Sequence, residues 1–387
     1  MSAEPDPKPP IYLDHHATTP LDPRVLEAME PWWTVDFGNP ASGNHVYGWR
    51  AEAAVEEARE RIAGVFGAES REVFFTSGAT ESNNLAILGV AEAQGSVGRH
   101  IVTAETEHPA VLDPCEYLEG QGWTVTRLPV AEDGRLDPDR LRASLREDTA
   151  LVSVMFANNE IGVIQPIETL ASICREQQVP FHTDAAQAAG RVAIDLGGHL
   201  IDLLSVSGHK IYGPKGVGAL FVRRRRPRVR LAPRQFGGGH EGGLRPGTLP
   251  VPLIVGLARA LEICVEERAQ ENARLLALKQ RLYERLQEAI PAIKLNGHAD
   301  QRLAGNLNLT FEGVDGARLL LALKGLAVSS GSACASAKPE PSHVLRALGL
   351  SEEQARSSLR FGLGRWTTSD EVEQAAGIVI AAVNEVR

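Results

Sequence analysis

The sequence has few cysteines, and none of them pairs with another at the spacing of a metal site. The four are Cys115, Cys174, Cys264 and Cys334, with no CxxC among them. This spacing argues against a zinc site, and no intrinsic metal site is expected. Free thiols fit a reducing compartment best, so the sequence predicts a cytoplasmic protein. Three of the thiols, all except Cys334, lie in apolar helical patterns and are expected to pack in the core.

Long apolar runs and an excess of positive charge are also absent. No stretch approaches the ~20 apolar residues that span a membrane. Residues 1–10 are polar and proline-rich, unlike a signal peptide. A net charge of -9 argues against a general nucleic-acid binder. What remains is a chain of 387 residues, 43% hydrophobic, which is long enough for a large core and two domains.

Apolar, β-branched segments alternate with helical patterns through the first two-thirds of the chain. Strands are predicted at 73–76, 100–103, 151–156, 179–184, 203–206 and 219–222, and helices from Thr80, from Pro109 and over 166–178. Strands separated by helices predict an α/β fold with a largely parallel sheet covered on both faces. Ligands of such sheets bind beyond the carboxyl ends of the strands.

The last third indicates a second, smaller part of α+β type. A long amphipathic helix over 252–288 is expected to link the two parts. Beyond it, strands are predicted at 306–311 and 358–362, with a helix over 316–323. A final helix begins near 368–370, where the N-cap signal is good.

Lys210 closes the run Ser-Val-Ser-Gly-His-Lys at 205–210, just after an apolar strand. A lysine among small and hydroxylated residues there could carry an aldehyde cofactor as a Schiff base. An ordinary lysine at the end of a strand is the alternative.

Residues 77–84 join a strand to a helix N-terminus, where free N–H groups and the helix dipole bind phosphate well. Thr80 adds a hydroxyl group, and Ser207 and His209 could supply further donors. A plain helix N-cap at Thr80 is the alternative.

Asp184 ends another predicted strand, on the same face as His182. A carboxylate there could keep a pyridinium nitrogen protonated, which makes the ring a strong electron sink. The alternative is an N-cap aspartate that opens a helix over 185–190.

Two further strand ends carry polar residues. His108 could stack on a cofactor ring and relay protons, or be a loop histidine without a role. The amides of Asn158 and Asn159 could reach the ring oxygen of a cofactor, or merely make a turn.

Residues 329–337 are nine small residues in a row, around Cys334. They bury little area, which predicts a mobile loop whose thiol could reach into a site and withdraw. A flexible linker with an incidental thiol is the alternative. Arg360 lies in an otherwise apolar strand, where it could clamp a substrate carboxylate or form a structural ion pair.

Together these segments closely resemble the cysteine desulfurases of the iron–sulfur-cluster and nitrogen-fixation type, in the class V aminotransferase family. The matching landmarks are 12–14, 17–20, 38–40, 77–84, 158–162, 205–210, 213–216, 237–241, 247–250, 329–334 and 360–365. The resemblance implies the fold type I of pyridoxal-phosphate enzymes. A large domain over 18–265 would hold a mainly parallel seven-stranded sheet, and residues 1–17 and 266–387 would form a small α+β domain.

The resemblance also implies a role for each residue of a pyridoxal 5'-phosphate site. Lys210 would bind the cofactor aldehyde, His108 would stack on the ring, and Asp184 would pair with the ring nitrogen. Gln187 and Asn159 would contact the side of the phenolic oxygen. The phosphate would be held by Ala79, Thr80, Ser207 and His209, with Thr248 completing the site of a neighbouring subunit in a homodimer.

For the reaction, the resemblance implies that L-cysteine becomes L-alanine. Arg360, with Asn159, would bind the substrate, and Cys334 would attack its sulfur and leave with it as a persulfide. Selenocysteine lyase or transaminase activity, or an inactive scaffold, are the alternatives, and the small-residue loop around Cys334 favours the desulfurase.

The sulfur would pass to an acceptor protein such as an iron–sulfur scaffold, with which Cys334 could transiently share a cluster. Close relatives continue beyond the position of Arg387 with a tail that helps to dock the scaffold, so scaffold docking stays an open question. Two departures from the family pattern are His15-His16, interpreted as neutral variation, and Gly242, where a basic residue is expected.

Overall fold

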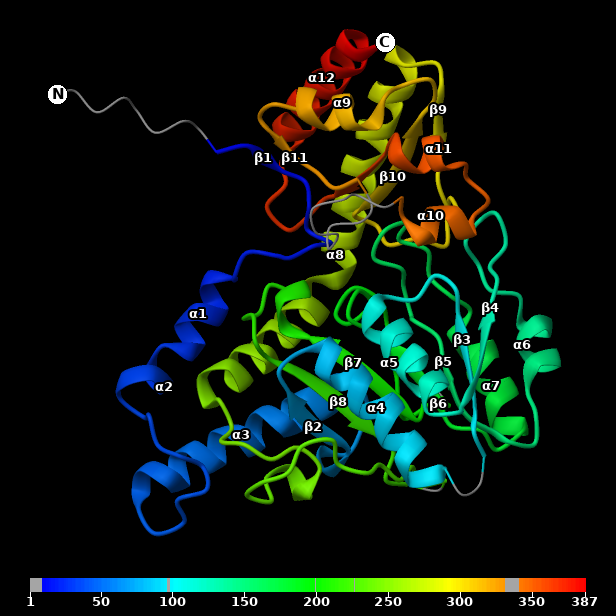
Figure 1. Ribbon diagram of the computed structural model, residues 1–387. Helices are drawn as coiled ribbons and strands as arrows, with labels where there is room; N and C mark the ends of the chain where they lie inside the picture. Colours follow the sequence, from blue (N-terminus) through cyan, green and yellow to red (C-terminus); the bar gives the residue numbers. More distant parts are fainter. Residues whose placement is uncertain (1–8, 96–97, 199, 226, 331–340) are drawn as a thin grey trace.

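The computed structural model describes residues 9–95, 98–198, 200–225, 227–330 and 341–387 (Figure 1). In Figure 1 the large sheet and its helices occupy the lower part of the molecule, and the smaller sheet lies in the upper part. The long helix α8 (Val251–Ala289) runs from one part to the other. It confirms the predicted linking helix.

Within the described residues, seven strands form the large sheet. Their spatial order is β2 (Val73–Thr76), β8 (Gly218–Val222), β7 (Leu203–Ser207), β6 (Phe181–Asp184), β5 (Thr149–Ser153), β3 (His100–Ala104) and β4 (Thr124–Leu128). Only β8 runs antiparallel to its two neighbours, and the other pairings are parallel. The predicted α/β fold with a mainly parallel seven-stranded sheet is confirmed.

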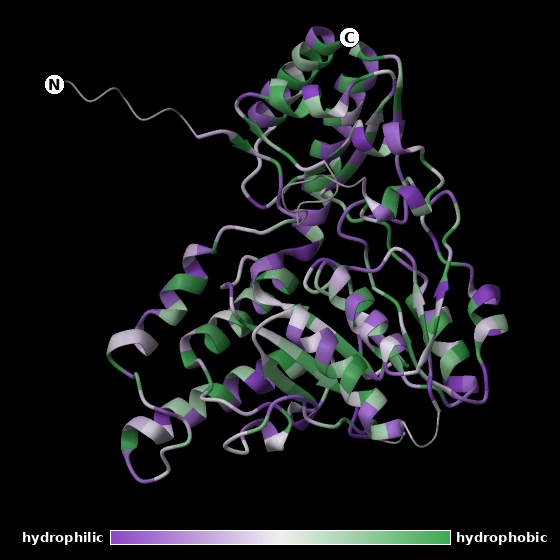
Figure 2. Ribbon diagram, in the orientation of Figure 1, coloured by the Kyte–Doolittle hydropathy of each residue, from purple (hydrophilic) through white to green (hydrophobic). Residues whose placement is uncertain are grey.

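Helices cover both faces of this sheet, which is why most of its strand residues are buried, including the polar residues of β6, whereas the edge strand β4 is largely polar and partly exposed (Figure 2). Successive side chains point to opposite faces, so Phe74 packs in one buried cluster and Phe75 in another. The cluster around Phe74 includes residues of α4 (Ala79–Gln94) and α5 (Pro109–Gly120). The opposite cluster includes residues of α1 (Pro23–Met29), α3 (Val46–Val65), α6 (Pro138–Ser144), α7 (Ile167–Glu176) and α8.

The smaller part is built on an antiparallel sheet with its own apolar core. Strand β10 (Asn306–Phe311) lies between β9 (Ile293–Leu295) and β12 (Ser358–Gly362). The helices here are α9 (Gly316–Ala322), α10 (His343–Ala347), α11 (Glu352–Arg356) and α12 (Ser369–Val386), whose N-cap is Thr368. Near the start of the chain, β1 (Ile11–Tyr12) pairs in parallel with β11 (Leu326–Ala327).

The two ends of helix α8 pack in different hydrophobic cores. Its buried residues up to Cys264 belong to the core of the large sheet, and those from Leu275 onward belong to the core of the small one. Leu13 also packs in the small core. These observations support the boundary between 265 and 266, and the assignment of 1–17 to the small domain, which stay predictions.

The structure contradicts two of the alternatives left open above, a helix over 185–190 and an N-cap at Thr80, and it changes the predicted strands at two places. Residues 185–190 form turns and not a helix, because Asp184 Oδ1 accepts a hydrogen bond from Ala186 N at 2.9 Å and Gly190 takes a φ of +73°. Helix α4 begins at Ala79 with Gly78 as its N-cap, so Thr80 is not the cap. The strand predicted over 151–156 ends at Ser153, and the edge strand β4 was missed because its side chains are largely polar.

Among the described residues, none of the helices combines the length and the apolar character needed to cross a membrane.

Candidate active site

The carboxyl ends of neighbouring strands bring several of the predicted residues together. Strand β6 ends at Asp184, and β7 ends at Ser207 and leads into the 3-10 turn η2 (Gly208–Lys210). His108 follows β3 and immediately precedes α5. Asp184 and Lys210 lie near enough to His108 to influence its pKa, which burial lowers. One edge of the sheet therefore carries the three residues predicted to stack on the cofactor ring, pair with its nitrogen and bind its aldehyde, which are His108, Asp184 and Lys210.

The amine of Lys210 is held by the N-terminal segment. Its Nζ donates to the main-chain oxygens of His16 at 2.8 Å and Ala17 at 2.7 Å. Gln187 Nε2 donates to the same His16 oxygen at 2.9 Å. Arg191 Nη2 donates to the Lys210 main-chain oxygen at 2.8 Å. Lys210 and Gln187, which are 23 positions apart in the sequence, thus converge on one carbonyl group.

The predicted phosphate-binding site lies where the N-terminus of α4 approaches the end of β7. A side chain on Gly78 would come 3.6 Å from Ser207 Oγ, and Thr80 is exposed there. Because the cap residue is a glycine, it has no side chain that could accept from the first N–H groups of α4. His209 Nδ1 lies 3.2 Å from Thr18 Oγ1, and burial lowers the pKa of His209 to about 4. Its ring is therefore neutral at physiological pH.

Asp184 is buried and fixed by two donors. Asn83 Nδ2, from α4, donates to Asp184 Oδ2 at 2.6 Å, and Ala186 N donates to Oδ1. Asn83 is fully buried, and its own Oδ1 accepts no hydrogen bond from the described residues. Sequence reasoning gave Asn83 no role, although it lies within the segment 77–84. Two positions before Asp184, the ring of His182 lies between two hydroxyl groups. Its Nδ1 is 2.8 Å from Ser153 Oγ, and its Nε2 is 3.0 Å from Ser205 Oγ.

His108 is held in one tautomer by the start of α5. Ala110 N donates to His108 Nδ1 at 3.0 Å, so the neutral ring carries its proton on Nε2. The neighbouring Glu107 is buried, which raises its pKa well above the usual value. Glu107 accepts a hydrogen bond from Met155 N at 2.7 Å, and its main-chain oxygen contacts His343 Nε2 at 2.9 Å.

Arg360 lies in strand β12 of the small sheet, and it is 1% exposed. Its guanidinium group contacts the turn that follows β5 of the large sheet. Its Nη2 donates to Asp14 Oδ1 at 2.7 Å, so the ion pair left open above is present. Its Nη1 donates to the Asn159 main-chain oxygen at 2.9 Å. Its buried Nε has no hydrogen-bond partner among the described residues. Two of the five N–H donors of the guanidinium group are therefore used in these contacts, and the others could serve a ligand.

The turn at 158–162 is made by Asn158 and not by Asn159. Asn158 Oδ1 accepts hydrogen bonds from Glu160 N at 2.8 Å and Ile161 N at 3.0 Å. Asn159 is half-buried. Burial raises the pKa of the Glu160 carboxyl to about 7. Of the two side-chain amides predicted to reach the cofactor, that of Asn158 therefore stabilises the turn.

The segment Asp14–Thr19 is the main component of the site that the sequence did not indicate. Asp14 contacts Arg360, and the carbonyl groups of His16 and Ala17 accept from the lysine amine. The segment contains landmarks of the resemblance, but no residue in it had been given a task. His16 Nδ1 also lies 2.9 Å from Gln187 Oε1, and burial lowers its pKa well below the usual value. The neutral interpretation of His15-His16 overlooked this contact.

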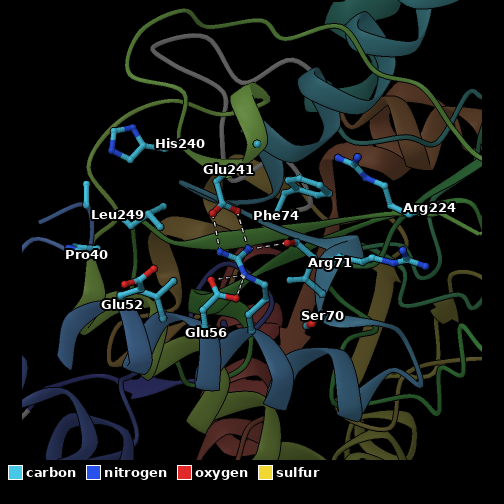
Figure 3. Close-up of a pocket in the computed structure, with 15 residues that line it drawn as sticks. Pro40, Glu52, Glu56, Ser70, Arg71, Phe74, Arg224, His240, Glu241 and Leu249 are labelled. Atoms are coloured by element: carbon cyan, nitrogen blue, oxygen red, sulfur yellow. Dashed lines mark hydrogen bonds and ion pairs between the residues drawn. The ribbon is translucent and has the colours of Figure 1, made fainter. Parts of the chain in front are cut away.

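Two predicted residues are not brought into this group. Cys334 lies outside the described residues. Thr248 is exposed and follows the glycine-rich loop that contains η3 (Glu241–Gly243). That loop borders a cavity of about 480 Å³, which is lined by residues of α3, β2 and the loop itself (Figure 3). The residues lining this cavity include none of the predicted cofactor residues.

Comparisons with known proteins agree with this arrangement. The family model of class-V aminotransferases matches residues 11–375. The cysteine desulfurase IscS of an Anaeromyxobacter species is 55% identical over 380 residues, covering 98% of this chain and 94% of that protein. The IscS of Tolumonas auensis is 53% identical over 382 residues, with the same two coverages. The chain belongs to the class-V aminotransferase family, among its cysteine desulfurases.

Solved structures of the family show the same fold. A NifS-like protein superimposes with a TM-score of 0.90 at 35% identity, covering 97% of this chain and all of that one. SspA in complex with cysteine gives a TM-score of 0.81 at 39% identity, covering 92% of this chain and 99% of that one. DndA from Streptomyces lividans is 47% identical, with a TM-score of 0.78 over 89% of this chain and 97% of that one.

Proposed function

We propose that this cysteine desulfurase uses pyridoxal 5'-phosphate and transfers the sulfur of L-cysteine to its own Cys334, releasing L-alanine. The observation that carries the proposal is the convergence of Lys210, Asp184 and His108 on one sheet edge, with Arg360 reaching the same region through the N-terminal segment. The complex of the related SspA with cysteine supports cysteine as the substrate.

The residues at this edge fit the cofactor. A phosphate suits the uncapped N-terminus of α4, beside Ser207 and His209. The Asp184 carboxylate, held in place by Asn83, suits a protonated ring nitrogen. Lys210 would bind the aldehyde carbon, and His108 would stack on the ring. When bound, the cofactor would supply an electron sink for the pair left by loss of the substrate Cα proton.

Each residue of this chain would then have a definite task. The Arg360 guanidinium, with Asn159 beside it, would hold the substrate carboxylate. Lys210 Nζ would take the Cα proton, and His108 Nε2–H would hydrogen-bond within the site. The Cys334 thiolate would attack the substrate sulfur. The carbon–sulfur bond of cysteine would break as a sulfur–sulfur bond forms on Cys334, and its electron pair would stay on the carbon skeleton. That skeleton would leave as alanine after Cβ gains a proton and a proton returns to Cα.

Two features support a homodimer in which Thr248 serves the phosphate site of the neighbouring subunit. Thr248 is exposed on the single chain, and large apolar side chains are exposed around the start of α3. The rings of Phe37 and Tyr47 lie 5.4 Å apart, with Trp33 and Trp49 exposed as well. Exposed apolar groups of this size mark interfaces more often than free surface.

The sulfur would pass from Cys334 to an acceptor protein, for which an iron–sulfur scaffold is our candidate. A reducing cytoplasm remains the expected compartment. Cys115, Cys174 and Cys264 are all buried and unpaired, which supports both the expected packing role and this location.

The test begins with the absorbance of protein purified with pyridoxal 5'-phosphate, before and after borohydride. The expected visible band should be absent in Lys210→Ala and present in Lys215→Ala, an exposed lysine five positions away. A colourless wild-type protein, or an unchanged band in Lys210→Ala, would overturn the cofactor assignment.

The second test measures alanine and sulfide formed from cysteine. Cys334→Ala should keep the cofactor band and lose sulfur transfer, and full activity in this variant would remove Cys334 from the mechanism. Sedimentation of the holoenzyme tests the dimer, with a monomer at micromolar concentration as the contradicting result.

A further inference from the structure

Arg191 lies one position beyond the turns at 185–190 and has no role in the proposed site so far. Its Nη1 donates to Gln187 Oε1 at 2.9 Å, and its Nη2 donates to the Lys210 main-chain oxygen at 2.8 Å. Nη1 also lies 3.2 Å from His16 Nδ1. One planar guanidinium group thus connects the turns after β6, the turn η2 and the N-terminal segment, which the chain supplies from three separate places.

The main chain that carries Arg191 is fixed against helix α8. Asn272 Nδ2, from α8, donates to the Arg191 main-chain oxygen at 2.9 Å. Gly190, directly before Arg191, takes a φ of +73°, and a Cβ at this position would come 2.6 Å from Cys264 Cβ of α8. Only glycine combines this backbone conformation with so close an approach. The guanidinium group therefore extends from a main chain whose position is set by α8.

The contact with Arg191 decides the orientation of the Gln187 amide, on a residue that is 4% exposed. A guanidinium group has five N–H donors and no acceptor, so the amide must turn its oxygen toward Arg191. Gln187 Nε2 then donates to the His16 main-chain oxygen at 2.9 Å, and this bond uses one of the two hydrogens of the NH2 group. Lys210 Nζ donates to the same oxygen, so Arg191 makes Gln187 a donor beside the lysine amine.

Arg191 lies among titratable side chains that burial keeps in their uncharged forms. Burial lowers the pKa of two histidines and raises the pKa of a tyrosine and a cysteine beside it, which are His15, His16, Tyr212 and Cys264. The carboxylate of Glu271, which faces three of these groups, pairs with Arg365 at 2.9 Å. Within the described residues, the Arg191 guanidinium group donates to the Gln187 amide oxygen and to main-chain oxygens, and not to a carboxylate.

We propose that Arg191 is a positioning residue of the cofactor site, which orients the Gln187 amide so that its NH2 group serves the phenolic oxygen of pyridoxal 5'-phosphate. The proposal rests on the proposed function and on the expected place of Gln187 beside that oxygen. Arg191 acts through Gln187 and does not itself touch the cofactor. A donor at the phenolic oxygen stabilises its negative charge, and thereby lowers the pH at which the cofactor bound to Lys210 loses its proton.

The pH titration of the visible absorbance band of the holoenzyme measures this effect. Arg191→Met removes the donors, and the midpoint of the titration should rise by about one pH unit, which corresponds to one hydrogen bond to a charged oxygen. Gln187→Ala should raise the midpoint by at least as much. Arg191→Lys keeps the charge without the planar fork and should raise the midpoint by less. It replaces the Met variant if that variant fails to fold or to bind the cofactor.

A double variant and a control separate orientation from charge. Arg191→Met/Gln187→Ala should shift the midpoint no further than Gln187→Ala alone, because Arg191 acts through the amide. Arg268→Met is the matched control, since Arg268 of α8 donates to the Val192 main-chain oxygen at 3.3 Å, and it should leave the midpoint unchanged. Every variant keeps the ionisable groups at the sheet edge, which are His108, Asp184, His209 and Lys210.

An unchanged midpoint in Arg191→Met, or in Arg191→Lys where it replaces the Met variant, would overturn the proposal. Shifts that add in the double variant would also overturn it, because the arginine would then act by its charge and not through Gln187. A wild-type protein without a visible band, or with a band that Lys210→Ala retains, would instead refute the proposed function.

Discussion

The ion pair between Glu241 and Arg59 gives the most direct prediction on stability. Arg59 donates from Nη1 and Nη2 to the two carboxylate oxygens of Glu241, at 2.9 and 2.7 Å, and Phe75 N donates to Glu241 at 2.7 Å. Arg59 Nε also donates to Glu56 Oε1 at 3.1 Å, and Figure 3 shows the side chains of Glu241 and Glu56 pointing toward one another. Glu241 also adopts a φ of +51°, which costs a residue with a side chain about 1–2 kcal/mol. The strain is tolerated because it aims the carboxylate at Arg59.

Glu241→Ala removes the partner of a guanidinium group on a residue that is 9% exposed. Breaking one side of a buried pair costs about 3–5 kcal/mol, because a charge is left without compensation. Glu56 contacts Arg59 Nε at 3.1 Å from a more exposed position, so it offsets part of this cost. We therefore expect the free energy of unfolding to fall by about 3 kcal/mol, at the lower end of that range.

Urea-induced unfolding of the wild type and of Glu241→Ala measures this change. The double variant Arg59→Met/Glu241→Ala should be less destabilised than the sum of its single variants, because both remove one interaction. Glu92→Ala is the control, since Glu92 pairs with Arg234 at 3.2 Å on the exposed surface and should cost less than about 1 kcal/mol. A loss in Glu241→Ala no larger than in Glu92→Ala would refute the reasoning.

Three further predictions concern the site itself. The raised pKa of Glu160, about 7 in the folded chain against an ordinary 4.5, stabilises the fold below pH 4.5, and this stabilisation is lost as the pH rises through 7. Urea unfolding at pH 5 and pH 8 should therefore show Glu160→Gln gaining roughly 3 kcal/mol relative to the wild type, and a difference independent of pH would contradict this. Gly218→Ala would bring a Cβ to 2.6 Å from Gly78 Cα, so we expect a loss of about 1–3 kcal/mol and weaker cofactor binding in a titration, with unchanged binding as the contrary result. Asn83→Ala would leave Asp184 Oδ2 without its 2.6 Å donor and should cost about 1–3 kcal/mol in urea unfolding, and a neutral effect would show that this bond does not hold the carboxylate.

Much of the fold could be predicted because its signals are local. Strands β2, β10 and β12 were predicted with the observed bounds, since each is an apolar run between turn residues. Helix α8 was predicted to within one residue at each end from its amphipathic pattern. Residues 185–190, for which a helix was the alternative interpretation, form turns because the capping preference of Asp184 serves a turn equally well.

The site could be predicted where its residues lie at the carboxyl ends of strands. Lys210, Asp184 and His108 each end or follow a strand, and parallel strands end at the same edge. Asn83 carried no signal of its own, because its effect depends on a contact with a residue 101 positions away. The sequence left open whether Arg360 binds a substrate carboxylate or forms an ion pair, because its partner Asp14 is 346 positions away.

The sequence by itself determined the alternation of strands and helices, the lysine suited to an aldehyde cofactor and the single thiol outside the apolar helical patterns. These follow from local patterns of apolar and small residues, which act over a few positions. The tertiary structure alone decided that the segment Asp14–Thr19 holds the lysine amine, that Asp14 neutralises Arg360, and that Glu160 holds Ser342. Such contacts join residues far apart in the chain, and only the packing of two cores along α8 brings them within hydrogen-bond distance.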